Sequence, residues 1–181
     1  MIQTFIRDYL KDRRKLVLLL FGIILILFIG TRFRVIFFFM LFAIITGFLT
    51  YTFDMTKIMI DPGLVSFFNI FFSYTLGFKY GLLVILIGLI IPEILSGEGI
   101  MDPATTGSIY AVTALVSSLF KSFDIVVLGI ALSFLQVILM FSLRSRIGVP
   151  IFEIVSEDGM ECILTIVYFI SFANLLLPLF R

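Results

Sequence analysis

The sequence contains no histidine, no tryptophan and a single cysteine, Cys162. Without histidine, the usual zinc and haem ligands and the imidazole general base are missing. A lone cysteine cannot form an internal disulfide or a thiolate cage for a metal. We therefore predict no cofactor and no metal site, and these absences remove most classes of enzyme.

Charged residues are scarce and nearly balanced in sign. They make up 14% of the 181 residues, with 13 lysines and arginines against 12 aspartates and glutamates. A surface that binds nucleic acid needs clustered basic side chains that acidic neighbours do not neutralise. The sequence therefore predicts no nucleic-acid partner.

Apolar residues dominate instead. They form 61% of the chain, and the mean hydropathy is +1.24. A chain of this size cannot bury so much hydrocarbon in a water-soluble core. The apolar runs are long and do not alternate with polar residues, which favours helices over barrel strands. We predict an all-α, polytopic integral membrane helical bundle, with residues 1–181 as a single domain in contact with membrane lipid.

The first thirty residues divide into a basic arm and a short apolar run. Residues 1–15 are similar to the start of a signal peptide, but no small-residue cleavage site follows, so we interpret them as a retained cytoplasmic arm. Residues 16–30 are wholly apolar, yet a helix of this length reaches only about 22 Å. A bilayer core is about 30 Å thick. The main bundle is therefore predicted for residues 35–180.

Six later apolar runs predict membrane helices. Asp61-Pro62 and Asp102-Pro103 resemble helix N-caps followed by proline in the first turn. Residues 147–159 are short and acidic, so they are predicted as a loop. The predicted helices cover residues 35–53, 62–76, 81–95, 103–120, 124–143 and 160–180.

The distribution of basic residues favours one topology over another. If residues 16–30 cross as a seventh helix, the cytoplasmic side carries eight lysines and arginines and the outer side five. If they do not cross, the numbers become ten and three. Cytoplasmic loops are enriched in these residues, so we expect six crossings of the cell membrane, with both termini in the cytoplasm.

The segment from Gly77 to Gly81 has two interpretations. It predicts a tight turn between two helices, or the middle of one long helix in which Ser73, Gly77 and Gly81 form a small-residue stripe for close packing. A single helix would be about 50 Å long and would place Lys79 at its centre, so the turn is favoured. In either case Ser73, Gly77, Gly81 and Gly88 are candidate helix-packing positions.

Two amides stand inside apolar runs, Asn69 and Gln136. A polar group in hydrocarbon should face the bundle interior, a cavity or an interface. Each amide could contact a ligand, or could form an interhelical hydrogen bond, which is the commoner role. Glu93 and Asp102 lie near helix ends, where headgroup water could solvate Glu93. The candidate ligand-binding residues are Asn69, Glu93, Asp102 and Gln136.

The remaining acidic residues fall into two groups. Glu98 and Asp102 could join Glu93 in a cation site, but no calcium-loop spacing supports this, so a solvated loop is predicted. In the second group, residues four apart share a helical face that could dock a partner or attract a cation, although a solvated acidic surface is the commoner case. The members of that face are Glu153, Glu157 and Glu161, with Asp158 beside them.

Residues 52–120 carry a succession of motifs: F-D-M-T-K-I-M-I-D-P-G-L-V-S-F-F, T-L-G-F-K-Y-G-L-L-V-I-L-I-G and I-L-S-G-E-G, followed by a small-residue helix. This succession resembles the substrate-binding S-components of energy-coupling factor transporters, and it is also similar to the rod-shape membrane protein MreD. The first resemblance implies a small hydrophobic or vitamin-like ligand under the outer loops and a transport energising module as partner. The second implies a non-catalytic scaffold that assembles a morphogenesis complex.

We therefore expect a membrane subunit for small-molecule binding or transport, with a scaffold protein as the alternative. An enzyme ranks last, because the sequence has no G-x-S-x-G or H-E-x-x-H motif and no imidazole to activate a nucleophile. A carboxylate-assisted reaction through Glu93 and Asp102 is the one catalytic chemistry that these residue types leave open.

Overall fold

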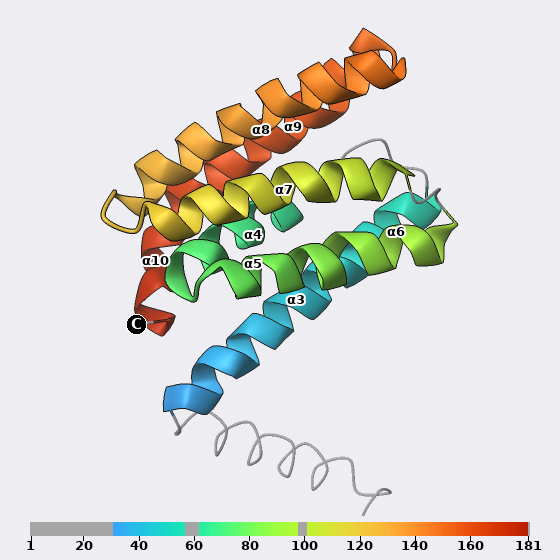
Figure 1. Ribbon diagram of the computed structural model, residues 1–181. Helices are drawn as coiled ribbons and strands as arrows, with labels where there is room; N and C mark the ends of the chain where they lie inside the picture. Colours follow the sequence, from blue (N-terminus) through green and yellow to red (C-terminus); the bar gives the residue numbers. More distant parts are fainter. Residues whose placement is uncertain (1–30, 57–61, 98–100, 181) are drawn as a thin grey trace, which may run out of the picture. The chain divides into compact units, whose positions relative to one another are not determined.

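The computed structural model of the chain describes residues 31–56, 62–97 and 101–180, and every regular element in these ranges is helical (Figure 1). The prediction of an all-α bundle is confirmed. The predicted arm (1–15) and short apolar helix (16–30) lie outside the described residues. The helices are α3 (Thr31–Thr56), α4 (Leu64–Thr75), α5 (Phe78–Ile85), α6 (Ile91–Ser96), α7 (Met101–Leu119), α8 (Ile125–Ile147), α9 (Ile151–Tyr168) and α10 (Asn174–Leu176).

Two of the helical passes are made of several elements. A π-helical turn, Leu86–Ile90, joins α5 to α6, and a second, Phe169–Ala173, joins α9 to α10, which ends in a 3₁₀ turn at Leu177–Leu179. The described residues thus form six helical passes. The residues from 40 onward form one compact unit, which contains α4 to α10 with their packed core, and the first residues of α3, up to Phe39, lie outside it.

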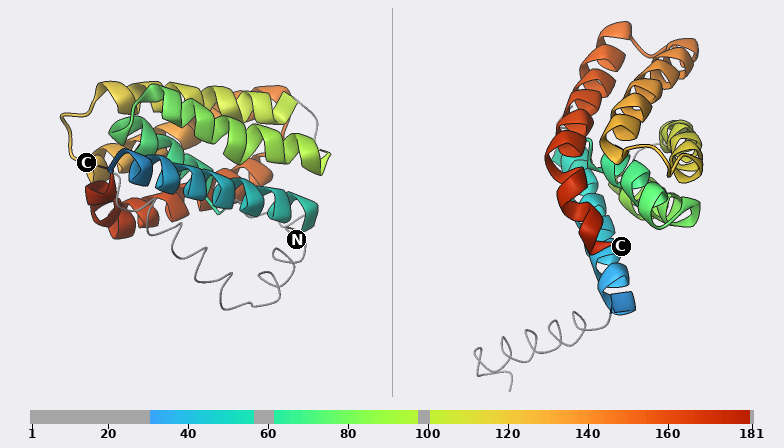
Figure 2. Two further views of the ribbon diagram at one scale, coloured as in Figure 1. Left: turned by 90° about the horizontal axis from the view of Figure 1, so that it is seen from below. Right: turned by 90° about the vertical axis from the view of Figure 1, so that its left-hand side faces the viewer.

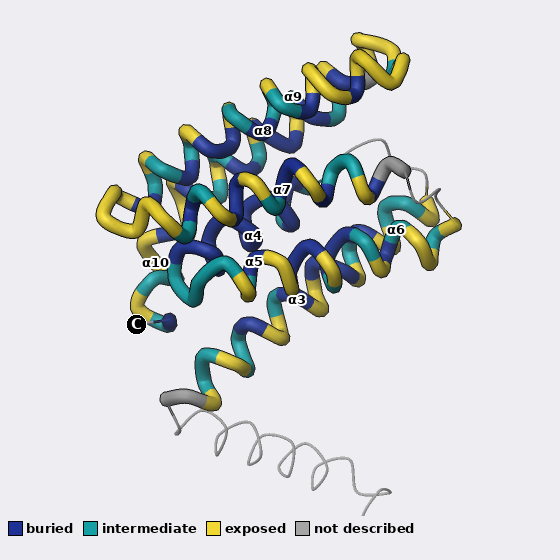
Figure 3. Tube along the Cα trace, viewed as in Figure 1, coloured by how far each residue is buried: buried dark blue, intermediate teal, exposed yellow. Residues whose placement is uncertain are grey.

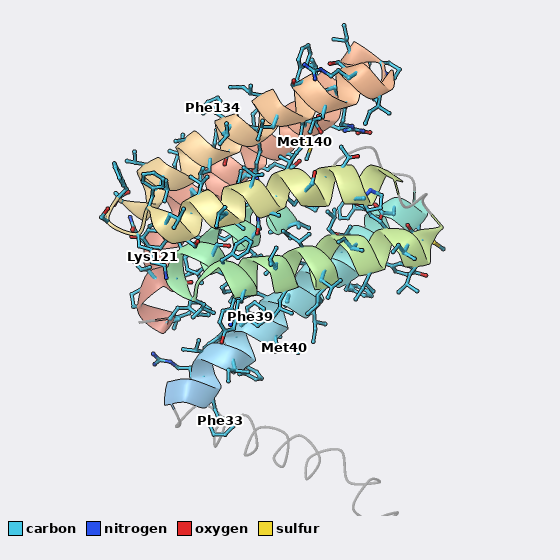
Figure 4. The ribbon with its side chains drawn as sticks, in the orientation of Figure 1. Phe33, Phe39, Met40, Lys121, Phe134 and Met140 are labelled. Atoms are coloured by element: carbon cyan, nitrogen blue, oxygen red, sulfur yellow. The ribbon has the colours of Figure 1, made fainter. Side chains whose placement is uncertain are left out.

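Four passes are long and apolar enough to cross a membrane: Phe33–Thr56, Phe78–Ser96, Ile125–Ile147 and Ile154–Leu179. Their surfaces stay apolar, as Phe48, Ile138 and Ile170 show, with more than 60% of each residue exposed. On α8, Phe134 is 55% exposed whereas Met140 is 2% exposed (Figure 4). Apolar surface of this extent requires lipid as the solvent, so the chain is an integral membrane protein.

The other two passes differ from lipid-facing spans. Helix α4 has 12 residues, ten of them buried, and it packs against α5, α7, α8 and α9 (Figure 3). A helix that is apolar all round belongs in the interior. At about 18 Å it is shorter than a bilayer core, so it is an internal element of the bundle. Helix α7 is long enough to cross but richer in serine and threonine.

The start of α4 differs from the prediction. The helix begins at Leu64, and its N-cap is Gly63 with φ 67°, without a side-chain cap. Asp61, the predicted cap, lies outside the described residues. A Cβ at position 63 would lie 2.8 Å from Thr165 Oγ1 and 2.9 Å from the Glu161 carbonyl oxygen. Glycine is therefore required twice, by the left-handed backbone and by the closeness of α9.

A turn separates α4 from α5, which excludes the single long helix. Gly77 has φ 109° and stands between the two helices. The turn is shorter than predicted, because Gly81 lies within α5. A Cβ at Gly81 would collide with Ser73 Oγ and would lie 3.0 Å from Ala114 Cβ. Gly88 is less crowded, with Thr46 Cγ2 3.3 Å from its virtual Cβ. Ser73, Gly81 and Gly88 thus lie at helix contacts, whereas Gly77 has open space and acts in the turn.

The predicted loop over residues 147–159 is wrong. Helix α8 continues to Ile147, and α9 begins at Ile151, so only three residues connect them (Figure 2). Gly148 ends α8 with φ 93°, and the Val149 amide donates to the Arg144 carbonyl at 3.1 Å. Glycine in this conformation closes a helix end, and Pro150 suits the start of the next helix. The acidic residues therefore lie on α9.

In the other half of the bundle, the predicted start of α8 is correct, whereas α7 begins before Asp102, its predicted N-cap. Helix α7 begins at Met101 and ends at Leu119, against the predicted 103–120. Helix α8 begins after Asp124, whose carboxylate accepts hydrogen bonds from the amides of Val126 at 2.9 Å and Val127 at 3.1 Å. This is the N-cap geometry in which a side chain satisfies the first amides of a helix.

Helix α8 depends on Gly129 for its approach to the C-terminal helix. A Cβ at this position would run into the ring of Phe169. We expect Gly129→Ala to lower the free energy of unfolding by about 1–3 kcal/mol through overpacking. The matched control is Gly159→Ala on α9, where no atom lies within 4 Å of the added methyl. That change should be neutral or raise stability by about 0.5–1 kcal/mol. Unfolding in detergent measures both, and equal effects would contradict this packing.

Candidate functional site

Buried polar side chains from four helices meet inside the bundle. We call this group the polar core. Each member is at most 7% exposed. Helices α8 and α9 belong to apolar passes that can cross the membrane, and α4 is mostly buried within the bundle. The members of the polar core are Ser66 and Asn69 of α4, Tyr110 and Thr113 of α7, Gln136 of α8 and Glu161 of α9.

The hydroxyl of Thr113 is the centre of this group. It accepts from Gln136 Nε2 at 3.0 Å and from Asn69 Nδ2 at 3.4 Å, and it donates to the Tyr110 carbonyl at 3.0 Å. A hydroxyl has one donor and two acceptor positions, so all of them are used. Thr113 therefore joins the two amides, from α4 and α8, that the sequence had singled out.

Both amides make further contacts between helices. Gln136 Oε1 accepts a hydrogen bond from the Ser66 hydroxyl. Asn69 Nδ2 also donates to the Tyr110 carbonyl at 2.9 Å. Interhelical hydrogen bonding, the commoner role for such residues, is thus what the structure shows. The Oδ1 atom of Asn69 is fully buried and accepts no hydrogen bond from the described residues.

Glu161 connects the polar core to α9. It is 7% exposed, and its carboxylate accepts a hydrogen bond from the phenol of Tyr110. One turn later, Thr165 Oγ1 donates to the Gly63 carbonyl at 3.2 Å. The prediction that this acidic face is solvated is wrong for Glu161, because the face points toward α7 and the start of α4.

A buried ion pair closes the α8–α9 hairpin. Arg144 donates to Asp158 at 2.9 Å and to Glu157 at 3.1 Å. The side chains of Arg144 and Asp158 are 10% and 6% exposed, and that of Glu157 is 26% exposed. Asp158 is therefore also not part of a solvated surface. The planar guanidinium can bind two carboxylates at once, which fixes the register of the two helices.

A small cavity lies between the ion pair and the polar core. Its volume is about 10 Å³, close to what one water molecule needs. Five of its seven lining residues carry a polar or sulfhydryl group, and this composition suits a hydrated site. The lining includes Ser133, Gln136, Met140, Asp158, Glu161 and Cys162.

The four predicted ligand-binding residues are not all brought together. Asn69 and Gln136 meet through Thr113. Glu93 is half-buried in α6, and its carbonyl accepts from Ser96 Oγ at 2.9 Å. The backbone of Asp102 lies in the first turn of α7, and its side chain, like Glu98, lies outside the described residues. No acidic and cysteine cluster in the described part of the chain has the arrangement of a metal site.

Sequence reasoning missed Ser66, Tyr110 and Thr113, and it assigned Glu161 to a solvated acidic face. A signal was present in α7, where Tyr110, Thr113 and Ser117 recur at helical spacing on one face, and all three are fully buried. Ser117 donates to the Ile70 carbonyl at 2.8 Å. A polar stripe on a membrane helix indicates a face turned toward other helices, so this pattern could have identified the face.

None of three comparisons, with protein-family models, with curated proteins and with solved structures, found a match. The resemblance to S-components and to MreD therefore stays a prediction from the motifs of residues 52–120. The membrane-embedded bundle and its polar core are properties of this chain itself.

The hydroxyl of Thr113 can be tested by an isosteric change. Thr113→Val removes the acceptor of two buried amide donors, and we expect it to lower the free energy of unfolding by about 1–2 kcal/mol. The control is Thr52→Val on α3, because the exposed Thr52 hydroxyl donates only within its own helix, to the Phe48 carbonyl at 2.7 Å. Thermal unfolding in detergent measures the difference, and equal loss in both variants would contradict the central role of Thr113.

The buried ion pair makes a second prediction for this region. Arg144→Met removes the guanidinium from buried Asp158, and we expect a loss of about 3–5 kcal/mol in the free energy of unfolding. Arg146→Met, at an exposed position two residues later, should change it little. The double variant Arg144→Met/Asp158→Leu should recover much of the loss because neither charge remains. An unchanged stability of Arg144→Met would contradict the pairing.

Proposed function

We propose that this integral membrane protein binds a small solute in its polar core and serves as the substrate-binding subunit of a transport system, as its resemblance to S-components implies. The observation that carries the proposal is the convergence of six buried polar side chains from four helices in a lipid-embedded bundle. Polar and ionisable groups in membranes are costly, and they commonly mark solute or ion pathways.

The polar core has the composition of a small-molecule site. Such sites are largely apolar, with a few placed polar groups that orient the ligand. Here the two amides offer donors and acceptors, and the buried Oδ1 of Asn69 keeps an acceptor position that no described residue uses. The interior of the bundle also contains fully buried apolar side chains such as Phe67, Ile70 and Leu89.

The interhelical hydrogen bonds set a condition on binding. Because Ser66, Thr113 and Gln136 bond to one another, a solute must replace these bonds or enter as α4 and α8 separate. We propose the arrangement described above as the solute-free state. Glu93 and Asp102 remain proposed contacts, Glu93 in the short helix α6 and Asp102 in the first turn of α7.

The packing favours one alternative, an MreD-like scaffold that assembles partner membrane proteins. Helices approach closely at Gly81 and Gly129, and also at Gly47, where a Cβ would collide with the Ile87 carbonyl oxygen. Tight helix contacts with polar groups that satisfy one another are sufficient to hold a rigid bundle. A scaffold would need no ligand in the polar core.

Native mass spectrometry of the purified protein distinguishes the two functions. We expect the wild type, in mild detergent and after lipid stripping, to retain a non-lipid adduct of fixed mass. Gln136→Leu and Asn69→Leu should lose it, because each removes an amide from the polar core. Ser133→Ala is the control: Ser133 lines the small cavity beside Gln136, but its hydroxyl donates to the Gly129 carbonyl of its own helix at 2.8 Å.

The opposite result is equally informative. If the wild type has no adduct and a membrane protein co-purifies with it, solute binding is contradicted and the scaffold function is supported. Thermal unfolding of each leucine variant is measured in parallel, so that loss of the adduct is interpreted only for variants that remain folded.

A further inference from the structure

Helix α4 carries two buried polar atoms that have no hydrogen-bond partner among the described residues, Asn69 Oδ1 and Ser73 Oγ. Both residues are fully buried. They stand four positions apart, so they share one face of α4. Buried polar groups nearly always have a partner, because an unpaired one lowers stability. Two such atoms on one face of the most enclosed helix therefore indicate a use outside the folded chain.

The Ser73 hydroxyl differs from comparable hydroxyls nearby. A serine or threonine inside a helix commonly donates to the carbonyl one turn earlier. Thr75 of the same helix donates to the Phe71 carbonyl at 2.9 Å, and Ser133 of α8 donates to the Gly129 carbonyl at 2.8 Å. Ser73 makes no such bond within the described chain. Its hydroxyl therefore keeps both a donor and an acceptor position unused.

The orientation of the Asn69 amide follows from its paired end. Asn69 Nδ2 donates to the Tyr110 carbonyl at 2.9 Å. A carbonyl can only accept, so the amide nitrogen must lie on that side and Oδ1 on the other. A Cβ at Gly81 of α5 would lie 2.9 Å from this Oδ1 and would collide with Ser73 Oγ. The two unused atoms thus meet at one point, which the backbone of α5 covers.

Helix α5 is less firmly held than the helix that it covers. Three of its eight residues are buried, against ten of twelve in α4. It follows the turn at Gly77, where no described atom lies within 4 Å of an added Cβ, and it leads into the π-helical turn Leu86–Ile90. Such turns are frequent at functional sites, and they are points at which helices bend. Of the two helices, α5 is therefore the one that can move.

The two atoms define the chemical group that they can bind. Asn69 Oδ1 can only accept, so the group must donate through O–H or N–H, and the Ser73 hydroxyl can donate to an oxygen of the same group. A hydroxyl or a primary amide meets both requirements. Both side chains are neutral, so a charged group would be buried without an opposite charge on these partners. The contact uses no atom that is already paired, so it can form before the solute replaces the bonds of Gln136.

We propose that Asn69 and Ser73 form the subsite for an uncharged hydroxyl or primary amide of the solute, which reaches them when α5 moves away from α4. This inference rests on the proposed solute-binding function. The outer side of α5 carries Leu82 and Leu83, which are 39% and 40% exposed. Exposed apolar side chains on this pass face lipid, so the subsite opens toward the bilayer and suits an amphiphilic solute.

Photolabelling of the full-length protein in liposomes tests the subsite with defined probes. The probes are aliphatic chains of equal length that carry a diazirine and end in a hydroxyl, a primary amide, a carboxylate or a methyl group. We expect the alcohol and the amide to label peptides of α4 or α5 saturably, and the other two to label them only at background. Equal labelling of these peptides by all the probes is ordinary lipid contact and would overturn the proposal.

Ser73→Ala separates a binding role of the hydroxyl from a structural one. Because this hydroxyl has no described partner to lose, the variant should be at least as stable as the wild type. Labelling by the alcohol should fall about three- to tenfold, the effect of one lost hydrogen bond. Thr75→Val is the matched control, since the Thr75 hydroxyl donates within α4, and its labelling should not change. Unchanged labelling of Ser73→Ala, or a marked loss of its stability, would overturn the subsite.

Hydrogen exchange tests the movement of α5 without any variant. We expect the amides of Phe78–Ile85 to exchange faster than those of Leu64–Thr75, and the alcohol probe to slow them. Equal exchange in the two helices, or no effect of the alcohol, would contradict a moving α5.

The subsite and the proposed function can fail separately. If Gln136→Leu loses the native adduct while Ser73→Ala keeps it and the alcohol labels nothing saturably, solute binding stands and the subsite is overturned. Labelling that depends on Ser73 in a protein without a native adduct supports the subsite and contradicts only the retention of a native solute.

Discussion

Every polar group inside a membrane bundle must find its partner within the protein, because lipid offers none. The arrangement of this chain depends on that constraint. Helix α4 is surrounded by other helices and carries Ser66 and Asn69, so its polar groups determine which faces of α7 and α8 turn inward. Thr113 meets both amides, and Tyr110 extends the same face of α7 to Glu161. The hydrogen bonds that satisfy these buried polar groups therefore also determine how the helices are arranged.

Short hydrogen bonds between helices require backbones that approach closely, and glycine permits this. Gly81 admits α4 beside α5, Gly129 admits the ring of Phe169, and Gly63 brings the start of α4 against α9. Around these contacts, edge-to-face aromatic pairs fill the space, such as Phe67 with Phe169 at 4.8 Å and 65°. Such pairs add about 0.5–1.5 kcal/mol beyond burial. Packing and polar pairing thus reinforce each other, and both functional proposals draw on the same residues.

Features that depend on neighbours in the sequence could be predicted, whereas features that depend on contacts between helices could not. Asn69 and Gln136 could be recognised because a single amide in an apolar run must face inward, whatever its neighbours are. Glu161 and Asp158 were placed on a solvated face because their neighbours in sequence are acidic. Their real surroundings, Tyr110 and Arg144, come from other helices. The turn at Gly77 was predicted correctly from local chemistry, whereas the α8–α9 connection was not, because pairing with Arg144 lets acidic residues continue a helix.

Composition and apolar run length were enough to establish lipid as the solvent and helices as the element, and to predict the six passes of residues 31–180, since these depend on each segment separately. The tertiary structure alone decided that α4 is an internal helix too short to cross, that Thr113 joins the two amides, and that two carboxyls border one cavity. The reason is physical: burial in lipid is a property of a segment, whereas a hydrogen bond between helices depends on where the partner segment lies. The polar core is therefore a product of the fold.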